Sequence, residues 1–306
     1  MIVTDLHIPA GVGWTALLTA YGRAQESRDP GGLVCDPFAS MFIQALSGGR
    51  VSGGDGLPRL GPAVDDRSST LWTAWRFYFS QRTPFYDQRI MHAIGEGAQQ
   101  VVLLAAGLDS RAFRLGWTER VTVFELDQAA VLDFKQAILT RHGASPTCHR
   151  VPLAVDLRGD WPATLRAAGF DPALRTVWVA EGLLMYLSRS EADWLLTTMT
   201  ALSAPGSRFA SEYFNNAWHD ADIASDTLDD QDWAAWNLVR GAFRYGPVTD
   251  TPAAWLTGHG WTPDQITTLV ELARQDNRTV PPEFGRAKAP QAWLFDGAYR
   301  PATTTD

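Results

Sequence analysis

Acidic residues follow two successive apolar runs in the middle of the chain, and a glycine turn precedes both. The stretch VVLLAAGLDSRAFRL, residues 101–115, starts with five apolar residues, turns at Gly107 and continues into a short predicted helix. The run ending in FELDQ brings Glu125 and Asp127, and the run ending in VDL brings Asp156. A strand, a glycine turn and a helix start form a common cradle for a nucleotide-like ligand, because the helix offers free N–H groups beside the strand ends.

The spacing of the glycines limits which ligand this turn could hold. A dinucleotide fingerprint needs three glycines, G-x-G-x-x-G, and here Gly107 stands alone. The phosphate loop G-x-x-x-x-G-K-[ST] does not occur in the sequence. A ligand that lacks phosphates but carries an adenosine and a charged tail needs only one close glycine contact. S-adenosylmethionine is such a ligand.

The acidic residues support this ligand. Side chains alternate along a strand, so Glu125 and Asp127 point the same way at the carboxyl end of their strand, where an acid can accept both ribose hydroxyls. Asp156 ends the next predicted strand, where its carboxylate can accept the exocyclic amino group of adenine while the backbone of Leu157 lies along the ring.

The elements that position these residues alternate between strand and helix. Buried strands are predicted at 101–105, 121–127, 150–157, 176–182 and 207–213, with helices between them. A late strand is predicted at 291–300, and the segment after Gly260 is compatible with either a strand or a helix. Alternation of this kind predicts an α/β fold with an open, mostly parallel sheet that binds ligands at the carboxyl ends of its strands.

The rest of the chain is predicted to cover that edge of the sheet. Residues 1–95 are expected to form a helical cap, with a loop from Gly48 to Pro62, and residues 96–306 the cofactor-binding core of one compact unit. A helical insertion at 215–240 carries Trp218, Trp233 and Trp236. The aromatic stripe Trp72, Trp75 and Phe79 is expected to be core of the cap rather than the wall of a substrate site.

Composition excludes several other classes of protein. The 306 residues include 26 basic and 34 acidic ones, a formal charge of −8, and no basic run is interleaved with aromatics, so nucleic acid is not an expected partner. No apolar run approaches the roughly 20 residues of a membrane span, and the N-terminus lacks a signal-like pattern, so a cytoplasmic protein is expected. Two distant cysteines and six scattered histidines show no metal-ligand spacing, and no metal is expected.

Six stretches together resemble the leucine carboxyl methyltransferase family, which includes many actinobacterial S-adenosylmethionine-dependent O-methyltransferases. They are ESRDPGGLVCDPFA, QRTPFYD, VVLLAAGLDSRAFRL, VFELDQAAVLDFK, VDLRGDWPATLRAAGFDP and WVAEGLLMYLS. The similarity spans roughly residues 15–212 in the family's order and weakens after Tyr213. It implies a Rossmann-like class I methyltransferase with a mostly parallel seven-stranded sheet and S-adenosyl-L-methionine as cofactor.

The resemblance also implies the residues that bind the cofactor. Arg82 would pair with the methionine carboxylate, Gly107 would lie against the methionine portion, and Glu181 would sit near the amino group and the sulfonium. Ala105 stands where the family usually has a glycine and adds a methyl group at this end. The full set is Arg82, Ala105, Gly107, Asp127, Asp156, Leu157 and Glu181.

Two of these residues also have structural interpretations. Asp127 is a favoured N-cap for the helix that starts near Gln128. Glu181 lies between apolar runs, where an unpaired carboxylate would be costly to bury, so a positively charged partner is expected, and the cofactor could supply it.

The acceptor is less determined than the cofactor. A carboxylate is ionised near neutral pH and needs no general base, whereas a phenol with a pKa of about 10 needs one. Tyr186, Tyr213, His219 and Glu212 are candidates for that base by position, and none is assigned. The favoured function is methylation of a carboxylate on a small molecule or a peptide C-terminus.

Three alternatives remain open beside carboxyl methylation. The enzyme could methylate a phenol or another hydroxyl in natural-product biosynthesis. The chain could be a cofactor-binding protein without catalysis. A dehydrogenase is disfavoured by the missing glycines.

Overall fold

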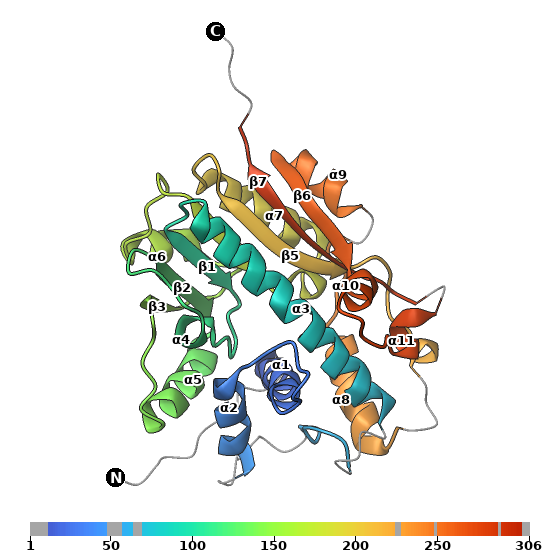
Figure 1. The fold of residues 1–306 in the computed structure, drawn as a ribbon. Coiled ribbons are helices and arrows are strands. Elements are labelled where there is room, and N and C mark those ends of the chain that lie inside the picture. Colours follow the sequence, from blue (N-terminus) through green and yellow to red (C-terminus); the bar gives the residue numbers. More distant parts are fainter. Residues whose placement is uncertain are drawn as a thin grey trace.

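A seven-stranded sheet forms the centre of the computed structural model, which describes residues 12–47, 57–63, 69–223, 228–247, 250–286 and 289–301. Its strand order is β3-β2-β1-β4-β5-β7-β6 (Figure 1). The strands are β1 (Gln100–Leu104), β2 (Thr122–Asp127), β3 (His149–Ala154), β4 (Thr176–Ala180), β5 (Arg208–Phe214), β6 (Trp261–Thr268) and β7 (Ala292–Tyr299). β1 to β5 pair in parallel, and β7 runs antiparallel to both β5 and β6. The predicted α/β fold with a mostly parallel sheet is confirmed.

The order of the strands creates the crevice in which such folds bind ligands. From β1 the chain proceeds outward through β2 to β3, then returns to the other side of β1 to place β4 and β5. The helices that follow β1 and β4 therefore depart to opposite faces of the sheet, which leaves an opening at the carboxyl ends of these strands.

Helices cover both faces, which explains why every residue of β1, β4 and β5 is buried. Val101 and Leu103 of β1 pack into a cluster with α3 (Thr70–Gly95), α5 (Ala129–Arg141) and α10 (Leu269–Gln275). The alternate residues Val102 and Leu104 pack with α6 (Trp161–Ala167), α7 (Arg189–Ala201) and α9 (Pro252–Gly258). The segment after Gly260 contains both predicted structures, since β6 runs directly into α10.

The N-terminal helices lie at the ligand-binding edge. α1 (Val12–Ser27) packs against α2 (Pro37–Ser47) and against α3, which crosses one face of the sheet (Figure 1). The part of the predicted loop from Gly48 to residue 56 lies outside the described residues. The division into a cap of residues 1–95 and a core stays a prediction.

The predicted insertion contains a helix and is tied to α3. α8 (Asp230–Gly241) begins inside the predicted range 215–240. Its Asp232 accepts hydrogen bonds from the Ser69 hydroxyl at 2.8 Å and from the Trp72 indole N–H at 2.7 Å. Ser69 is the N-cap of α3, so these bonds hold the beginning of α3 against the insertion. The remaining described helices are α4 (Arg111–Arg114) and α11 (Pro282–Gly285).

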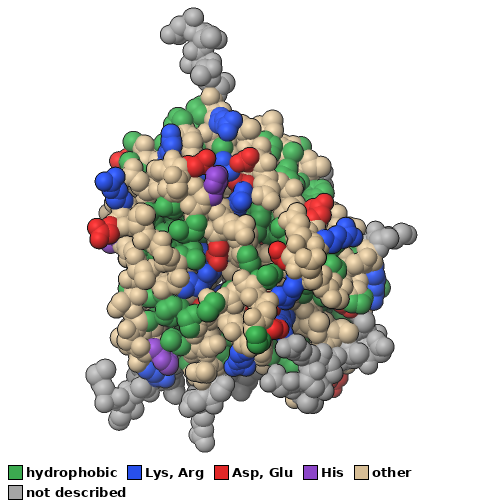
Figure 2. Space-filling model, viewed as in Figure 1, with side chains coloured by type: hydrophobic (Ala, Val, Ile, Leu, Met, Phe, Trp, Pro, Cys, Tyr) green, Lys and Arg blue, Asp and Glu red, His purple; other side chains and the backbone are tan. Residues whose placement is uncertain are grey.

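Two observations concern the expected partners, namely the distribution of charge on the surface and the hydropathy of the helices. On the face shown in Figure 2, acidic and basic side chains are interspersed. None of the helices within the described ranges combines the length and the hydropathy that crossing a bilayer requires.

Glu125 takes a structural position instead of facing the ligand-binding edge. It is fully buried, and its Oε2 accepts from Lys135 Nζ and from Arg150 Nη2, each at 2.7 Å. Lys135 is also fully buried, on α5. The three charges fasten α5 and β3 onto β2 beneath the point where Asp127 emerges.

We predict that Glu125→Gln lowers the free energy of unfolding by about 3–5 kcal/mol, because it leaves the Lys135 ammonium buried without its carboxylate. Urea denaturation at neutral pH measures the change. The double variant Glu125→Gln, Lys135→Met removes the orphaned charge and should recover part of the loss. A single-variant loss below about 1 kcal/mol would contradict the assignment of this pair as a structural requirement.

Candidate functional site

One cavity of about 460 Å³ opens at the carboxyl ends of β1 to β4, within the size range of small-molecule sites. All seven residues predicted to bind the cofactor line it: Arg82, Ala105, Gly107, Asp127, Asp156, Leu157 and Glu181. Strand ends form its polar half. Side chains of α1, α3, α8 and α11, together with Phe214, Trp218, Ile223, Phe243 and Arg244, form most of the remainder.

The turn after β1 has an unusual backbone at two positions. Ala105 has φ of 53° and Gly107 has φ of 50°, both in the left-handed region. For alanine this conformation costs roughly 1–2 kcal/mol, which explains why a glycine would be the easier residue at position 105. At Gly107 an added Cβ would come within 3.3 Å of Ala16 Cβ on α1. The turn therefore lies close beneath α1, and its lack of a side chain permits that approach.

Asp127 closes this turn from the end of β2. Its Oδ2 accepts from Gly107 N at 2.6 Å, and its Oδ1 accepts from Gln128 N at 2.7 Å. Burial raises the pKa of Asp127, although both backbone hydrogen bonds oppose that shift. The N-cap of α5 is Gln128, so the proposed capping role of Asp127 is wrong. Its carboxylate is held rigidly at the cavity instead.

Asp156 and Leu157 form the outer rim beyond β3. Asp156 is exposed and pairs with Arg158 at 2.6 Å, and the hydrogen bonds from Arg158 lower the pKa of Asp156 to about 2. The carboxylate is thus ionised at any physiological pH. Leu157 follows it as a half-buried apolar side chain in the cavity wall.

Arg82 stands at the centre of a buried ionic network. Its Nη1 lies 2.7 Å from Glu212 Oε1, and its Nε lies 3.1 Å from Glu181 Oε1. Glu212 Oε1 also accepts from the Tyr78 hydroxyl at 3.1 Å and from Gly182 N at 2.8 Å. The guanidinium therefore joins α3 to the ends of β4 and β5.

The partner that Glu181 was expected to need comes from the protein. Besides Arg82, Arg111 Nη1 lies 2.7 Å from Glu181 Oε2. Arg111 is itself paired with Asp87 at 2.7 Å and with Asp109. Two arginines of the protein thus pair with Glu181, and each of them also pairs with at least one other carboxylate.

The structure separates the residues considered as general bases. Tyr186 lines the cavity, and burial raises its pKa to about 12, so its hydroxyl stays protonated. Tyr213 packs into the core on the other face of the sheet and donates to the Asp250 carbonyl at 2.6 Å. His219 is exposed and is not among the lining residues. Glu212 is fully buried behind Tyr78.

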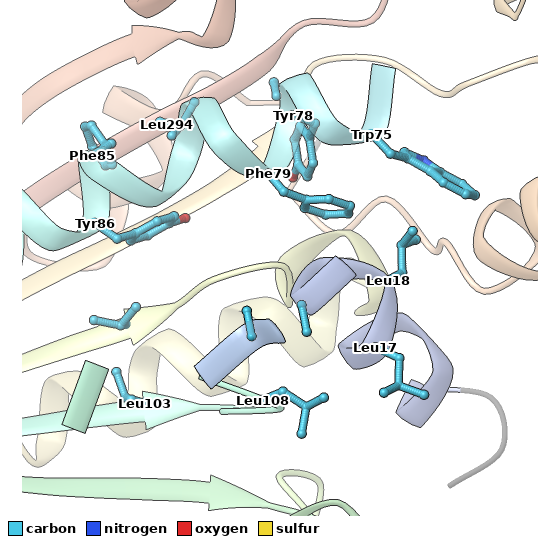
Figure 3. Close-up of a cluster of buried hydrophobic side chains, with 14 of the residues drawn as sticks. Leu17, Leu18, Trp75, Tyr78, Phe79, Phe85, Tyr86, Leu103, Leu108 and Leu294 are labelled. Atoms are coloured by element: carbon cyan, nitrogen blue, oxygen red, sulfur yellow. The ribbon is translucent and has the colours of Figure 1, made fainter. Parts of the chain in front are cut away.

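The half of the cavity away from the strand ends is aromatic. We call six of its lining residues the aromatic wall: Trp75, Tyr78, Phe214, Trp218, Trp236 and Phe284. Figure 3 shows Trp75, Tyr78 and Phe79 projecting from α3 toward α1. As expected, Trp72, Trp75 and Phe79 all belong to the hydrophobic core, and Trp72 donates to Asp232. Trp75 and Phe79 also line the cavity.

Tyr78 is the residue that sequence reasoning missed. It lies one turn before Arg82 on α3, so helical spacing could have placed both on the same side. Its bond to Glu212 depends on β5, far along the chain, and the sequence carries no signal for that contact.

Comparison with known proteins identifies the family. The family model of leucine carboxyl methyltransferases matches residues 16–200, more than half of the chain. A protein of Mycobacteroides abscessus named as an S-adenosyl-L-methionine-dependent methyltransferase is 38% identical over 283 residues, 89% of each chain. One of Rhodococcus jostii with the same name is 40% identical over 282 residues, 90% of each chain.

A solved structure is similar at a lower level. The magnesium protoporphyrin IX methyltransferase of Synechocystis PCC 6803, with bound SAH, gives a TM-score of 0.44 at 11% identity, covering 73% of this chain and 86% of that chain. The sequence relatives favour the methyltransferase over the alternatives of a dehydrogenase and a protein without catalysis. The chain belongs to the leucine carboxyl methyltransferase family, and it is a methyltransferase that uses S-adenosylmethionine.

Proposed function

We propose that the protein is an O-methyltransferase whose acceptor is a carboxylate, carried by a small molecule or by a peptide C-terminus. The supporting observation is that the cavity offers no uncommitted base. Among the described residues, its lining includes no histidine and no lysine. Each lining carboxylate already has a partner, namely Asp109, Asp127, Asp156, Glu181 and Glu191. A carboxylate acceptor is ionised at neutral pH and needs no proton removed.

Tyr186 is suited to orient such an acceptor. Because burial raises its pKa to about 12, its hydroxyl keeps a proton at neutral pH and can donate it in a hydrogen bond to a carboxylate oxygen. The same side chain interacts with the Thr15 hydroxyl of α1, which limits its movement.

The polar half of the cavity fits S-adenosylmethionine. Asp127 would hold the ribose, because each carboxylate oxygen accepts one backbone hydrogen bond and retains capacity for another. Leu157 would lie along the face of the adenine ring, and the Asp156 carboxylate would accept a hydrogen bond from the exocyclic amino group of the adenine. Gly107 lines the part of the cavity where the methionine portion would lie, as do Arg82 and Glu181.

The chain's contribution to methyl transfer is positioning. The cofactor supplies the activated methyl group when it is bound. α1 and α3 cover the site and exclude water, and the buried Arg82 network holds the end of β4 in one arrangement. Fixing two reactants in a reactive orientation can account for a large part of the rate of such a displacement.

Methylation of a phenol is the second candidate, and one observation favours it. Glu212 Oε2 is buried without a hydrogen-bond partner among the described residues, and burial raises the pKa of this carboxyl. Tyr78 links Glu212 to the cavity, so a proton from a hydroxyl acceptor could pass through Tyr78 to this carboxylate.

We predict that Asp127→Ala weakens S-adenosylmethionine binding at least about tenfold, because each lost charge-assisted hydrogen bond is worth about 1.5–3 kcal/mol. Calorimetric titration measures the dissociation constant. The control is Asp133→Ala, which removes an exposed carboxylate from the solvent side of α5. If a folded Asp127→Ala protein binds S-adenosylmethionine as tightly as the control does, Asp127 does not contact the cofactor.

The pKa of Asp127 adds a pH dependence to this binding. The ionised carboxylate accepts the ribose hydrogen bonds, and burial raises the pKa of Asp127 above its usual value. The affinity for the cofactor should therefore be highest near neutral pH and should decline as the pH falls through that raised pKa. Titrations from pH 7.5 to 4.5 would test this, with Asp127→Ala losing the dependence.

Arg82→Lys should also weaken cofactor binding about tenfold or more, since a single ammonium cannot contact Glu181 and Glu212 in the way that the guanidinium fork does. The matched control is Arg76→Lys on the same helix, whose partners Glu26 and Asp29 lie outside the cavity. If the two variants bind the cofactor equally well, Arg82 has only a structural role.

The carboxylate proposal predicts a turnover rate that is nearly constant from pH 6 to 9. A carboxylate with a pKa near 4 does not titrate there, and Tyr186 with a pKa of about 12 remains protonated. Product carrying a labelled methyl group should release labelled methanol in dilute alkali, as an ester does. A rate that rises with pH, together with label that survives alkali, would establish the phenol instead.

A further inference from the structure

We infer that the acceptor is a compact aromatic molecule, bound with its ring system against the aromatic wall and its reactive oxygen toward Tyr186. This inference rests on the proposed O-methyl transfer and narrows its acceptor. It selects an aryl acid over a peptide C-terminus. The observations that carry it are the contacts, polarity and position of the wall.

Five of the six residues of the aromatic wall, all except Trp75, form one continuous set of ring contacts. Tyr78 stacks on Phe214 with centroids 5.7 Å apart, and Phe214 meets Trp218 edge to face at 5.6 Å. Trp218 in turn meets Trp236 at 6.0 Å and Phe284 at 5.5 Å, again edge to face. Rings that pack against one another in this way form rigid faces and edges on which a further ring can stack.

The wall reaches the residue that would orient the acceptor. Phe214 contacts Phe243 at 5.9 Å, and Phe243 contacts Tyr186 at 5.1 Å. Tyr186 belongs to the short helix η1 (Leu184–Tyr186) that follows β4, on the side of the cofactor-binding strand ends. A ring held by the wall therefore has its polar substituent at the boundary between the two halves of the cavity.

Three polar side chains near the wall already have partners. The Tyr78 hydroxyl donates to Glu212, and the Thr19 hydroxyl on α1 donates to the carbonyl of Ala16. Arg244 at the rim pairs with Glu191. The other lining residues of this half include Leu71, Ile223 and Val239, which are apolar.

A peptide would be poorly matched to these surroundings. Each amide that enters the wall would lose its water without gaining a hydrogen bond, which is costly. An aryl group loses only apolar hydration and gains stacking or edge-to-face contacts. The cavity of about 460 Å³ must also hold the cofactor, which favours a compact acceptor.

Binding to the protein saturated with S-adenosylhomocysteine tests the inference without turnover. The probes are 2-naphthoic acid, 2-naphthol, decanoic acid and a tetrapeptide ending in leucine, each titrated calorimetrically. We expect at least one naphthalene to bind tenfold or more tightly than the peptide and decanoic acid. Tighter binding of the peptide or of decanoic acid would overturn the inference.

Two variants locate the binding site. Val239→Phe fills the aromatic half from α8, and its control is Ala234→Phe on the exposed side of the same helix. Val239→Phe should weaken binding of the naphthalene probe at least tenfold and leave the affinity for S-adenosylhomocysteine unchanged, whereas the control should change neither. Ile223→Phe fills the same half from another segment and replaces Val239→Phe should that variant not fold. Unchanged naphthalene binding in a folded filling variant would overturn the inference.

Methyl transfer to the same probes separates this inference from the proposed function. Methylation of 2-naphthol but not of 2-naphthoic acid would support an aromatic acceptor and refute the carboxylate. Methylation of the peptide alone would agree with the proposed methylation of a carboxylate and would refute the inference of an aromatic acceptor.

Discussion

The buried guanidinium of Arg82 is the interaction on which the arrangement of the site depends. It lies between Glu181, which follows β4, and Glu212 on β5, and Arg82, in the middle of α3, is only 3% exposed. A buried cation of this kind is stable only when its hydrogen bonds to the carboxylates are well formed. The position of α3 across the sheet is therefore set by charge pairing as well as by apolar packing.

Both halves of the cavity follow from that position. On the cofactor side, Arg82 and Arg111 keep Glu181 paired, so the turn after β4 has a defined arrangement before any ligand binds. On the other side, α3 presents Tyr78 and Trp75 to rings from β5, α8 and α11. The bonds from Ser69 and Trp72 to Asp232 fix the beginning of α3 to α8. One helix, held at two points, thus defines where polar and aromatic surfaces meet.

The same organisation explains the division of chemical roles. In the proposed function, strand ends and backbone groups would supply the contacts to S-adenosylmethionine, while side chains that come mostly from helices would supply the acceptor surface. Because the hydroxyl of Tyr186 is buried and its pKa is raised to about 12, the boundary between the two surfaces offers a proton donor. That property favours an acceptor that is already an anion.

The sequence by itself predicted most of the strands, their mostly parallel pairing and the candidate cofactor residues that meet at one edge of the sheet, because these depend on short-range patterns. Apolar runs predict buried strands, and Gly107, Asp127 and Asp156 fall at strand ends that a parallel sheet must bring to one edge. What only the tertiary structure decided were pairings between distant segments. Glu125 and Asp127 look equivalent in the sequence, yet ion pairs with Lys135 and Arg150 hold Glu125 in the core. Tyr78 joins Glu212 across 134 positions, and Trp75 packs in the core and also lines the cavity. Such contacts leave no local pattern, since burial, charge pairing and ring packing between remote elements are settled only when the whole chain folds.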